Sequence, residues 1–402
     1  MDGWFVVVLG FQKLKSESGL CCDRTDREEI GAENMAGVRP FVESDVATVA
    51  DLVWKVLHER QGTAPPSLRN YLRELFLQNP WIDDGIISRV FENTEGRILG
   101  FFGALPRRMS LQGETIRLAF GSNLVVDPQG RASIIAMQLV KAFMKGTQDI
   151  SITDSANEMS RPLLRSLGFA TVPIYSLQWA RPLRPFQYGF DTLSRFKKSR
   201  TVGAIASIAK PISRLADVLA TRSRLSPFRQ LESEHHDEEL DTETLLQCLN
   251  TIPSRHWILP EYDLDSLNWV LEFVSQKKVF GDLRKAQVRD KDQKIVGWYI
   301  YSLARGNVGE VFQIGAESPS INIVLDHLFH DAWKQGLIGL HGRMEPQCMQ
   351  ELTAKSCFFF RNGSWTLVHS KKPNLLAVLQ SGAAFFSRLE GEWSLRHGGR
   401  EA

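Results

Sequence analysis

The sequence predicts an α+β protein of two consecutive domains, each a mixed, mostly antiparallel sheet flanked by helices. The chain has 402 residues, of which 43% are hydrophobic, which is enough for two buried cores. Its hydrophobic period alternates between that of strands and that of helices, in the same order in both halves. The predicted units are an N-terminal extension (1–34), a first domain (35–180), a basic amphipathic helical linker (181–240) and a second domain (241–402).

The first domain is predicted to open with a strand and two helices, followed by an antiparallel hairpin and a long bulged strand. Asn93–Thr94–Glu95–Gly96 is the hairpin signal, and small or polar residues interrupt the apolar pattern of the bulged strand. The predicted elements are strand 38–42, helix 43–60, helix 68–78, strands 86–92 and 97–105, strand 118–126, a helix from 132, a strand at 150–152, helix 156–167 and a last strand through 175–177.

Overall composition excludes several classes of protein. A net charge of +2 is too small to indicate nucleic acid as a specific partner, and the apolar run near the N-terminus is too short to span a bilayer. Five cysteines without metal-like spacing indicate reduced thiols in a cytoplasmic protein and no metal site. Residues 1–34 lack periodicity, so we expect a disordered extension or a misassigned start, with Met35 as the true first residue.

The loop Asp127–Pro128–Gln129–Gly130 separates the bulged strand from the following helix. The backbone N–H groups of Gly130, Arg131, Ala132 and Ser133 therefore sit at a helix N-terminus, where unpaired donors and the helix dipole favour an anion such as a pyrophosphate. Arg131 adds a cation beside them.

These residues resemble the acyl-CoA motif of the GNAT acyltransferase superfamily. Val126, Pro128 and Arg131 match its V-x-P-x-x-R spacing, whereas Ile134 stands where the family usually has glycine. The resemblance implies that CoA binds where two parallel strands splay apart. It implies acetyl-CoA or another acyl-CoA as co-substrate, held by Leu124, Val125, Val126, Gln129, Gly130, Arg131, Ala132 and Ser133.

Downstream residues resemble the second half of the same family. Asn157, followed by Leu163, Leu167, Gly168 and Phe169, is similar to its N-x-x-A-x-x-L-Y-x-x-L-G-F pattern, which implies that Asn157 lies near the CoA arm. Leu164 stands where the family often has a tyrosine that protonates the departing thiolate.

Acyl transfer also needs a group that deprotonates the acceptor. No carboxylate lies between Arg117 and Val126, so Ser122, Asn123 or a water that they hold is one candidate, and Asp154 is another. A strand-end hydroxyl or a helix cap explains the same residues at least as well.

The linker is basic, with eleven Lys and Arg between 181 and 231 against Asp191 and Asp217. An apolar stripe, interrupted by Pro211, is expected to dock on a flanking domain, with contact of 181–230 with an anionic membrane surface as the rarer alternative. Its members are Ile205, Ile208, Ile212, Leu215 and Leu219.

The second domain repeats the order of elements of the first, and the two together resemble tandem GNAT and Fem-like transferases. Its loop Gly315–Pro319 carries Glu317, which would repel phosphate, so this domain is expected to complete the acceptor site without binding acyl-CoA. The predicted function is acyl transfer to a small-molecule, saccharide or peptide acceptor. The alternatives are a non-catalytic protein that binds CoA or a partner, and an aminoacyl transferase that uses charged transfer RNA.

Overall fold

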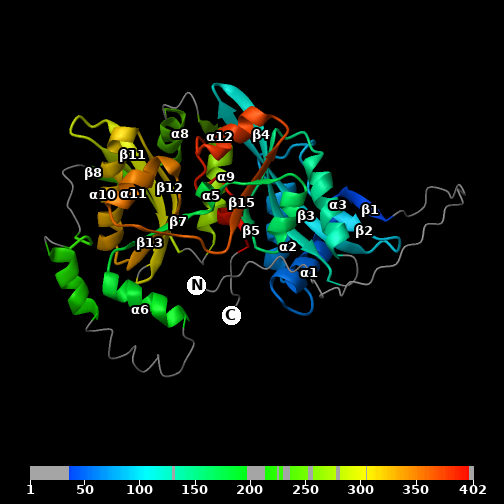
Figure 1. Cartoon of the computed structure of the whole chain (residues 1–402), viewed down its shortest axis with the longest axis horizontal. Coiled ribbons are helices and arrows are strands. Elements are labelled where there is room, and N and C mark those ends of the chain that lie inside the picture. The colour runs from blue at the N-terminus through cyan, green and yellow to red at the C-terminus, as the bar shows by residue number, and fades with distance from the viewer. Residues whose placement is uncertain are drawn as a thin grey trace, which may run out of the picture.

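Two β-sheets lie side by side in the molecule, each covered by helices (Figure 1). The computed structural model describes residues 36–128, 132–196, 213–223, 226–229, 236–251, 257–277, 281–304 and 306–397. The predicted extension 1–34 lies outside them. No helix among the described residues is both long and apolar enough to cross a bilayer.

Among the described residues, sheet A contains eight strands, of which only β4 and β5 form a parallel pair. The order is β1-β2-β3-β4-β5-β15-β6, and β9 pairs with β3 outside this path. The strands are β1 (Gly37–Pro40), β2 (Arg89–Glu92), β3 (Ile98–Leu111), β4 (Glu114–Val126), β5 (Ile150–Ala156), β6 (Ala170–Thr171), β9 (Ile258–Pro260) and β15 (Trp365–Ser370).

Both faces of sheet A are covered. The η1 turn (Glu43–Asp45) leads into α1 (Val46–Leu57), which with α2 (Pro66–Leu77) packs on one face; α3 (Ala132–Met144) and α4 (Ser160–Ser166) lie on the other. The core on the α1 side continues to α8 (Thr242–Thr251), α9 (Leu264–Ser275) and sheet B. One apolar cluster thus joins the two sheets.

Sheet B contains seven strands in the order β14-β7-β13-β12-β11-β10-β8, with β12 and β13 as its parallel pair. The strands are β7 (Gln178–Pro182), β8 (His236–Glu239), β10 (Leu283–Arg289), β11 (Ile295–Ser302), β12 (Val308–Ala316), β13 (Gly339–Arg343) and β14 (Phe358–Phe360). The η2 turn (Ser318–Ser320) and α10 (Ile321–Lys334) follow β12, and η3 (Pro346–Cys348) and α11 (Met349–Ala354) follow β13. The mixed, mostly antiparallel sheets flanked by helices confirm the predicted fold class.

The two halves of the chain exchange strands, which the sequence did not predict. The expected last strand of the first half is helix α5 (Pro173–Ser176) followed by β7, and β7 pairs with β13 and β14 of sheet B. In return, β15 from the second half pairs with β5 and β6, and β9 extends sheet A beside β3. In Figure 1 the orange β15 runs beside β5 for this reason. The sheets therefore do not divide the chain at residues 180 and 241.

Both ends of the segment predicted as a linker (181–240) belong to sheet B: Arg181 and Pro182 end β7, and His236–Glu239 form β8. Strand β8 pairs with β10, and Arg181 and Arg184 donate to backbone carbonyls of Lys355 and Trp333 at the ends of α11 and α10. Helix α6 (Pro185–Phe196) and helical residues 213–222 project from this sheet in Figure 1. Leu215 and Leu219 are each 68% exposed, so these two side chains do not dock on a domain; the other members of the predicted stripe, Ile205, Ile208 and Ile212, lie outside the described residues.

The C-terminal segment, residues 383–397, follows α12 (Pro373–Gln380) and runs back between the two sheets. Phe385, Phe386 and Leu389 are fully buried, and η4 (Trp393–Leu395) packs against α9. The amine of Lys277 donates to the carbonyl of Ser394 at 2.6 Å, which fixes this segment to the end of α9.

We predict that residues 36–184, expressed alone, do not unfold cooperatively, because sheet A then lacks β9, β15 and the C-terminal segment. Thermal unfolding followed by circular dichroism measures this, and mixing with a fragment 185–402 should restore a sharp transition. A sharp transition of the first fragment on its own would contradict the strand exchange as a stabilising contact.

Candidate functional site

The parallel strands β4 and β5 separate part-way along their length. Their register runs from Leu118 opposite Ile150 to Phe120 opposite Ile152 and stops there. Residues 121–126 of β4 and 153–156 of β5 therefore do not pair with each other. This opening, the β4–β5 splay, is the feature that the family resemblance implied for acyl-CoA.

A β-bulge in β4 lies at the start of the splay, as the sequence predicted. The register with β3 shifts between Phe101 and Gly103, and Asn123 has a φ of 52°. The bulge reverses which side chains face the α1 side, because Phe120 packs there before it and Val125 packs there after it. Ser122 is buried on this strand, and the Asn123 amide lies 3.5 Å from the hydroxyl of Tyr71 on α2.

A carboxylate that the sequence analysis missed reaches the splay from the C-terminal segment. Glu392 is 4% exposed and accepts hydrogen bonds from Ser122 on β4, at 3.0 Å, and from Ser155 on β5. It thus bridges the two strands where they part. Burial raises the pKa of Glu392 above its ordinary value, while the nearby Arg396 guanidinium and the two serine hydroxyls oppose this shift.

Asp154, the other predicted candidate, forms a buried ion pair. Its carboxylate lies 2.9 Å from a guanidinium nitrogen of Arg343 on β13, and the two side chains are 2% and 7% exposed. Arg343 also donates to Thr366 Oγ1 on β15 and to the backbone carbonyl of Tyr175. Asp154 therefore links sheet A to sheet B, whereas Glu392 is the carboxylate that faces Ser122.

The fold has counterparts among solved structures. A probable N-acyltransferase from Enterococcus faecalis, described as a conserved protein of unknown function, matches with a TM-score of 0.54 and 11% identity over 84% of this chain and 73% of its own. A GCN5-related N-acetyltransferase from Anabaena variabilis matches with a TM-score of 0.53 and 10% identity over 84% and 74%. This chain has the GNAT fold. No family model matches the sequence, and no curated protein matches it at a significant level.

The predicted cofactor residues of this GNAT fold lie along β4 and at the start of α3. Leu124, Val125, Val126 and Ala132 are buried, and Ser133 is on the first turn of α3; Gln129, Gly130 and Arg131 lie outside the described residues. Asp127, just before the loop, is buried and accepts from Lys55 at 3.1 Å and from Arg97 at 3.2 Å. Two cations therefore neutralise the one carboxylate at the entrance to the loop.

Two further family positions have structural roles here. The Asn157 side-chain oxygen accepts from the backbone N–H groups of Met159 and Ser160, so it caps the start of α4. Leu164 is buried in the core behind α3. The general-acid position of the GNAT pattern is thus a core residue, and the hydroxyl that lies near the bulge is that of Tyr71.

Sheet B contains a second splay, between β12 and β13. Their pairing ends at Val311 opposite Gly342, and the same C-terminal segment enters this opening, where the Leu389 N–H donates to the Phe312 carbonyl at 3.3 Å. Glu390 accepts from Gln313 at 2.8 Å and from the Tyr262 hydroxyl at 3.1 Å. One segment therefore places Glu390 in the second splay and Glu392 in the first.

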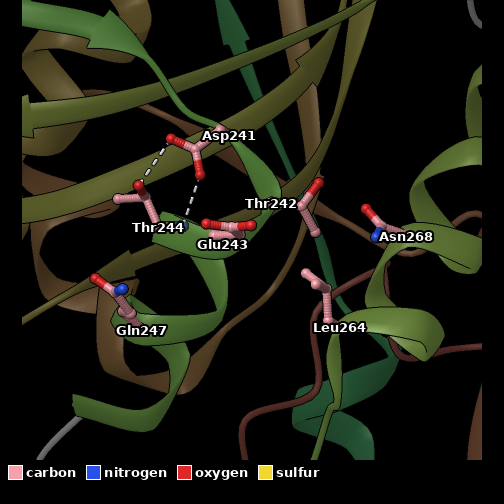
Figure 2. Close-up of a pocket in the computed structure, with 7 residues that line it drawn as sticks. All are labelled: Asp241, Thr242, Glu243, Thr244, Gln247, Leu264 and Asn268. Atoms are coloured by element: carbon pink, nitrogen blue, oxygen red, sulfur yellow. Dashed lines mark hydrogen bonds between the residues drawn. The ribbon is translucent and has the colours of Figure 1, made fainter.

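Two hollows lined by described residues differ in size and position. Figure 2 shows an open hollow of about 480 Å³ at the start of α8 and α9, lined by residues that include Thr242, Gln247 and Asn268. The Asp241 carboxylate there accepts from Thr244 and caps α8. A cavity of about 20 Å³ beside Asp154 has room for about one water.

Within the described parts of the chain, no three His, Cys, Asp or Glu side chains are grouped closely enough to hold a metal ion. Cys248, Cys348 and Cys357 are buried free thiols.

We predict that Gly391→Ala destabilises the protein by roughly 1–3 kcal/mol, the usual range for overpacking. A Cβ at Gly391 would lie 2.2 Å from the Asp154 carboxylate and 3.1 Å from Arg343. Denaturant unfolding measures the loss. The control is Gly189→Ala in α6, where a Cβ meets nothing within 4 Å and stability should be unchanged or raised. Equal stability of Gly391→Ala and the natural protein would mean that the C-terminal segment passes Asp154 less closely.

Proposed function

We propose that this protein transfers an acyl group from acyl-CoA, with acetyl-CoA as the first choice, to an amine or hydroxyl of a small-molecule, saccharide or peptide acceptor. The observation that carries the proposal is the position of Glu392, which joins Ser122 and Ser155 where β4 and β5 part. The GNAT fold supplies the splay, and the C-terminal segment supplies the carboxylate that β4 itself lacks.

The proposed chemistry uses the residues at the bulge. The acceptor nitrogen attacks the thioester carbon, so that a C–N bond forms and the C–S bond breaks, while a backbone N–H of the bulge holds the carbonyl oxygen. The proton of the attacking group passes to Ser122 as that hydroxyl gives its own proton to Glu392. The raised pKa of Glu392 suits a base that works nearer to neutral pH than a free carboxylate.

The departing thiolate needs a hydrogen-bond donor, and we assign this role to Tyr71. Its hydroxyl lies beside Asn123, and burial raises the pKa of Tyr71 well above its ordinary value, so the group stays protonated. It takes the place of the tyrosine that Leu164 replaces.

We assign CoA pyrophosphate binding to the loop from Gln129 to Ser133, with Arg131 as its cation. Helix α3 has thirteen residues, so its N-terminus carries the full helix dipole. The pairing of Asp127 with Lys55 and Arg97 supports this assignment, because a phosphate at the loop would not meet a bare carboxylate.

The second half of the chain completes the acceptor site in this proposal and binds no acyl-CoA. Glu317 lies at the start of η2, in the place that corresponds to the pyrophosphate loop, and its carboxylate lies 3.9 Å from the amine of Lys294. We assign the reaction to the cytoplasm, where the buried thiols of Cys248, Cys348 and Cys357 would stay reduced.

A non-catalytic CoA-binding or partner-binding protein is the second candidate. It is favoured by the C-terminal segment, whose buried residues occupy both splays. Release of free CoA from acetyl-CoA in the presence of a panel of amines distinguishes the two candidates, because binding alone leaves the thioester intact.

We predict that Glu392→Gln lowers kcat by roughly 100-fold, the scale of general-base catalysis. The base acts as a carboxylate, so kcat/KM of the natural protein should rise with pH through the raised pKa of Glu392, and the variant should lose this rise. The release of free CoA, measured across pH, tests both the fall in kcat and the loss of the rise in kcat/KM. The matched control is Glu390→Gln, two residues away in the second splay, which should keep the rise. An unchanged pH profile in Glu392→Gln would remove the assignment.

We predict that Arg131→Glu weakens CoA binding by roughly 1.5–3 kcal/mol, because a charge-assisted hydrogen bond is lost. Isothermal titration calorimetry with CoA measures the change. Arg165→Glu, an exposed arginine on α4, is the control and should bind CoA as the natural protein does. Equal CoA affinity of the Arg131→Glu and Arg165→Glu variants would mean that the pyrophosphate lies elsewhere.

A further inference from the structure

The helical residues 213–222 are amphipathic, but their polar side faces the protein. Asp217 and Thr221 are 3% and 6% exposed, whereas Leu215 and Leu219 are each 68% exposed and Val218 is 44% exposed. A helix that packs on a domain normally buries its apolar side. This arrangement therefore presents a row of apolar side chains outward.

Helix α6 presents a second apolar row. Phe186 and Leu193 are 53% and 64% exposed and lie seven residues apart, on one face of the helix. The Asp217 carboxylate accepts from the backbone N–H groups of Phe186 and Gln187 at 2.8 and 3.1 Å, so it caps the start of α6. This contact ties the two helices to each other. We call Phe186, Leu193, Leu215, Val218 and Leu219 the apolar patch.

The charge around the apolar patch is positive. Arg214 and Arg222 on the second helix are exposed, as is Arg229 a little farther along the chain. The carboxylate of Asp217 is buried and used as a cap, so it does not offset these cations at the surface. Basic groups beside outward apolar side chains are the pattern of helices that lie in the interface of an anionic bilayer.

We propose that α6 and residues 213–222 dock the protein on the surface of a membrane that contains anionic phospholipids. Arg214 and Arg222 are exposed and positively charged, and lipid phosphates are negatively charged. This complementarity favours an anionic membrane over an uncharged surface. Arg181 and Arg184 hold the start of this region to sheet B. The two helices project at the side of sheet B (Figure 1), whereas the β4–β5 splay belongs to sheet A.

Co-sedimentation of the full chain with vesicles tests the proposal. The natural protein should bind vesicles of phosphatidylcholine mixed with phosphatidylglycerol, bind less as salt rises, and fail to bind phosphatidylcholine alone. The double variant Leu215→Gln/Leu219→Gln should raise the lipid concentration for half-maximal binding by at least ~10-fold. The double variant Arg214→Gln/Arg222→Gln should raise it as well, and should flatten the salt dependence.

The control is Ile82→Gln, since Ile82 is a similarly exposed apolar residue between α2 and β2, outside the apolar patch. It should bind vesicles as the natural protein does, and thermal unfolding should show all three variants folded. The proposal is overturned if the natural protein does not bind anionic vesicles, or if Ile82→Gln weakens binding as much as the leucine pair. It is also overturned if sedimentation velocity shows a dimer that depends on Leu215 and Leu219 without vesicle binding, because the patch then joins two copies of the chain.

Discussion

The structure depends on how the space between diverging parallel strands is filled. When β4 leaves β5, and when β12 leaves β13, each strand loses the backbone partner on one side in the interior of the protein. Buried N–H and C=O groups need partners, so another part of the chain must enter. In sheet B the C-terminal segment supplies a backbone partner, because the Leu389 N–H donates to the Phe312 carbonyl; in sheet A its Glu392 carboxylate instead accepts from the side-chain hydroxyls of Ser122 and Ser155.

Charge placement follows from this arrangement. Filling the openings with peptide brings Glu390 and Glu392 out of water, and burial raises the pKa of both. The segment also brings Arg396 near Glu392, while the Asp154–Arg343 pair joins the two sheets beside Gly391. A buried carboxylate that is held by hydroxyls and partly balanced by a cation is the environment in which proton transfer near neutral pH becomes feasible. The C-terminal segment thus contributes both to the packing of the interior and to the proposed chemistry.

Local features of the sequence predicted most of the elements. Helix α3 begins at the predicted Ala132, because period and turn residues act over a few positions. Pairing between distant segments was not predictable in this way. Nothing in Gln178–Pro182 indicates sheet B rather than sheet A, and Ser122 and Glu392 are 270 residues apart. The amphipathic pattern around Leu215 predicted that this helix has an apolar side, but not the direction in which that side faces. The direction follows from Asp217, which is buried because it caps α6, so that the opposite, apolar side faces outward.

The exchange of strands also sets the order in which the molecule can be assembled. Residues of β5 can pair with β4 as soon as both are synthesised, but the other edge of β5 waits for β15, and Ser370 is 221 residues beyond its partner Asp149. Contacts at such separation form slowly, because the intervening chain loses entropy when they close. Until then β5 is an open edge that can pair with another chain. Folding of this protein should therefore be slower and more sensitive to concentration than that of two independent domains of the same size.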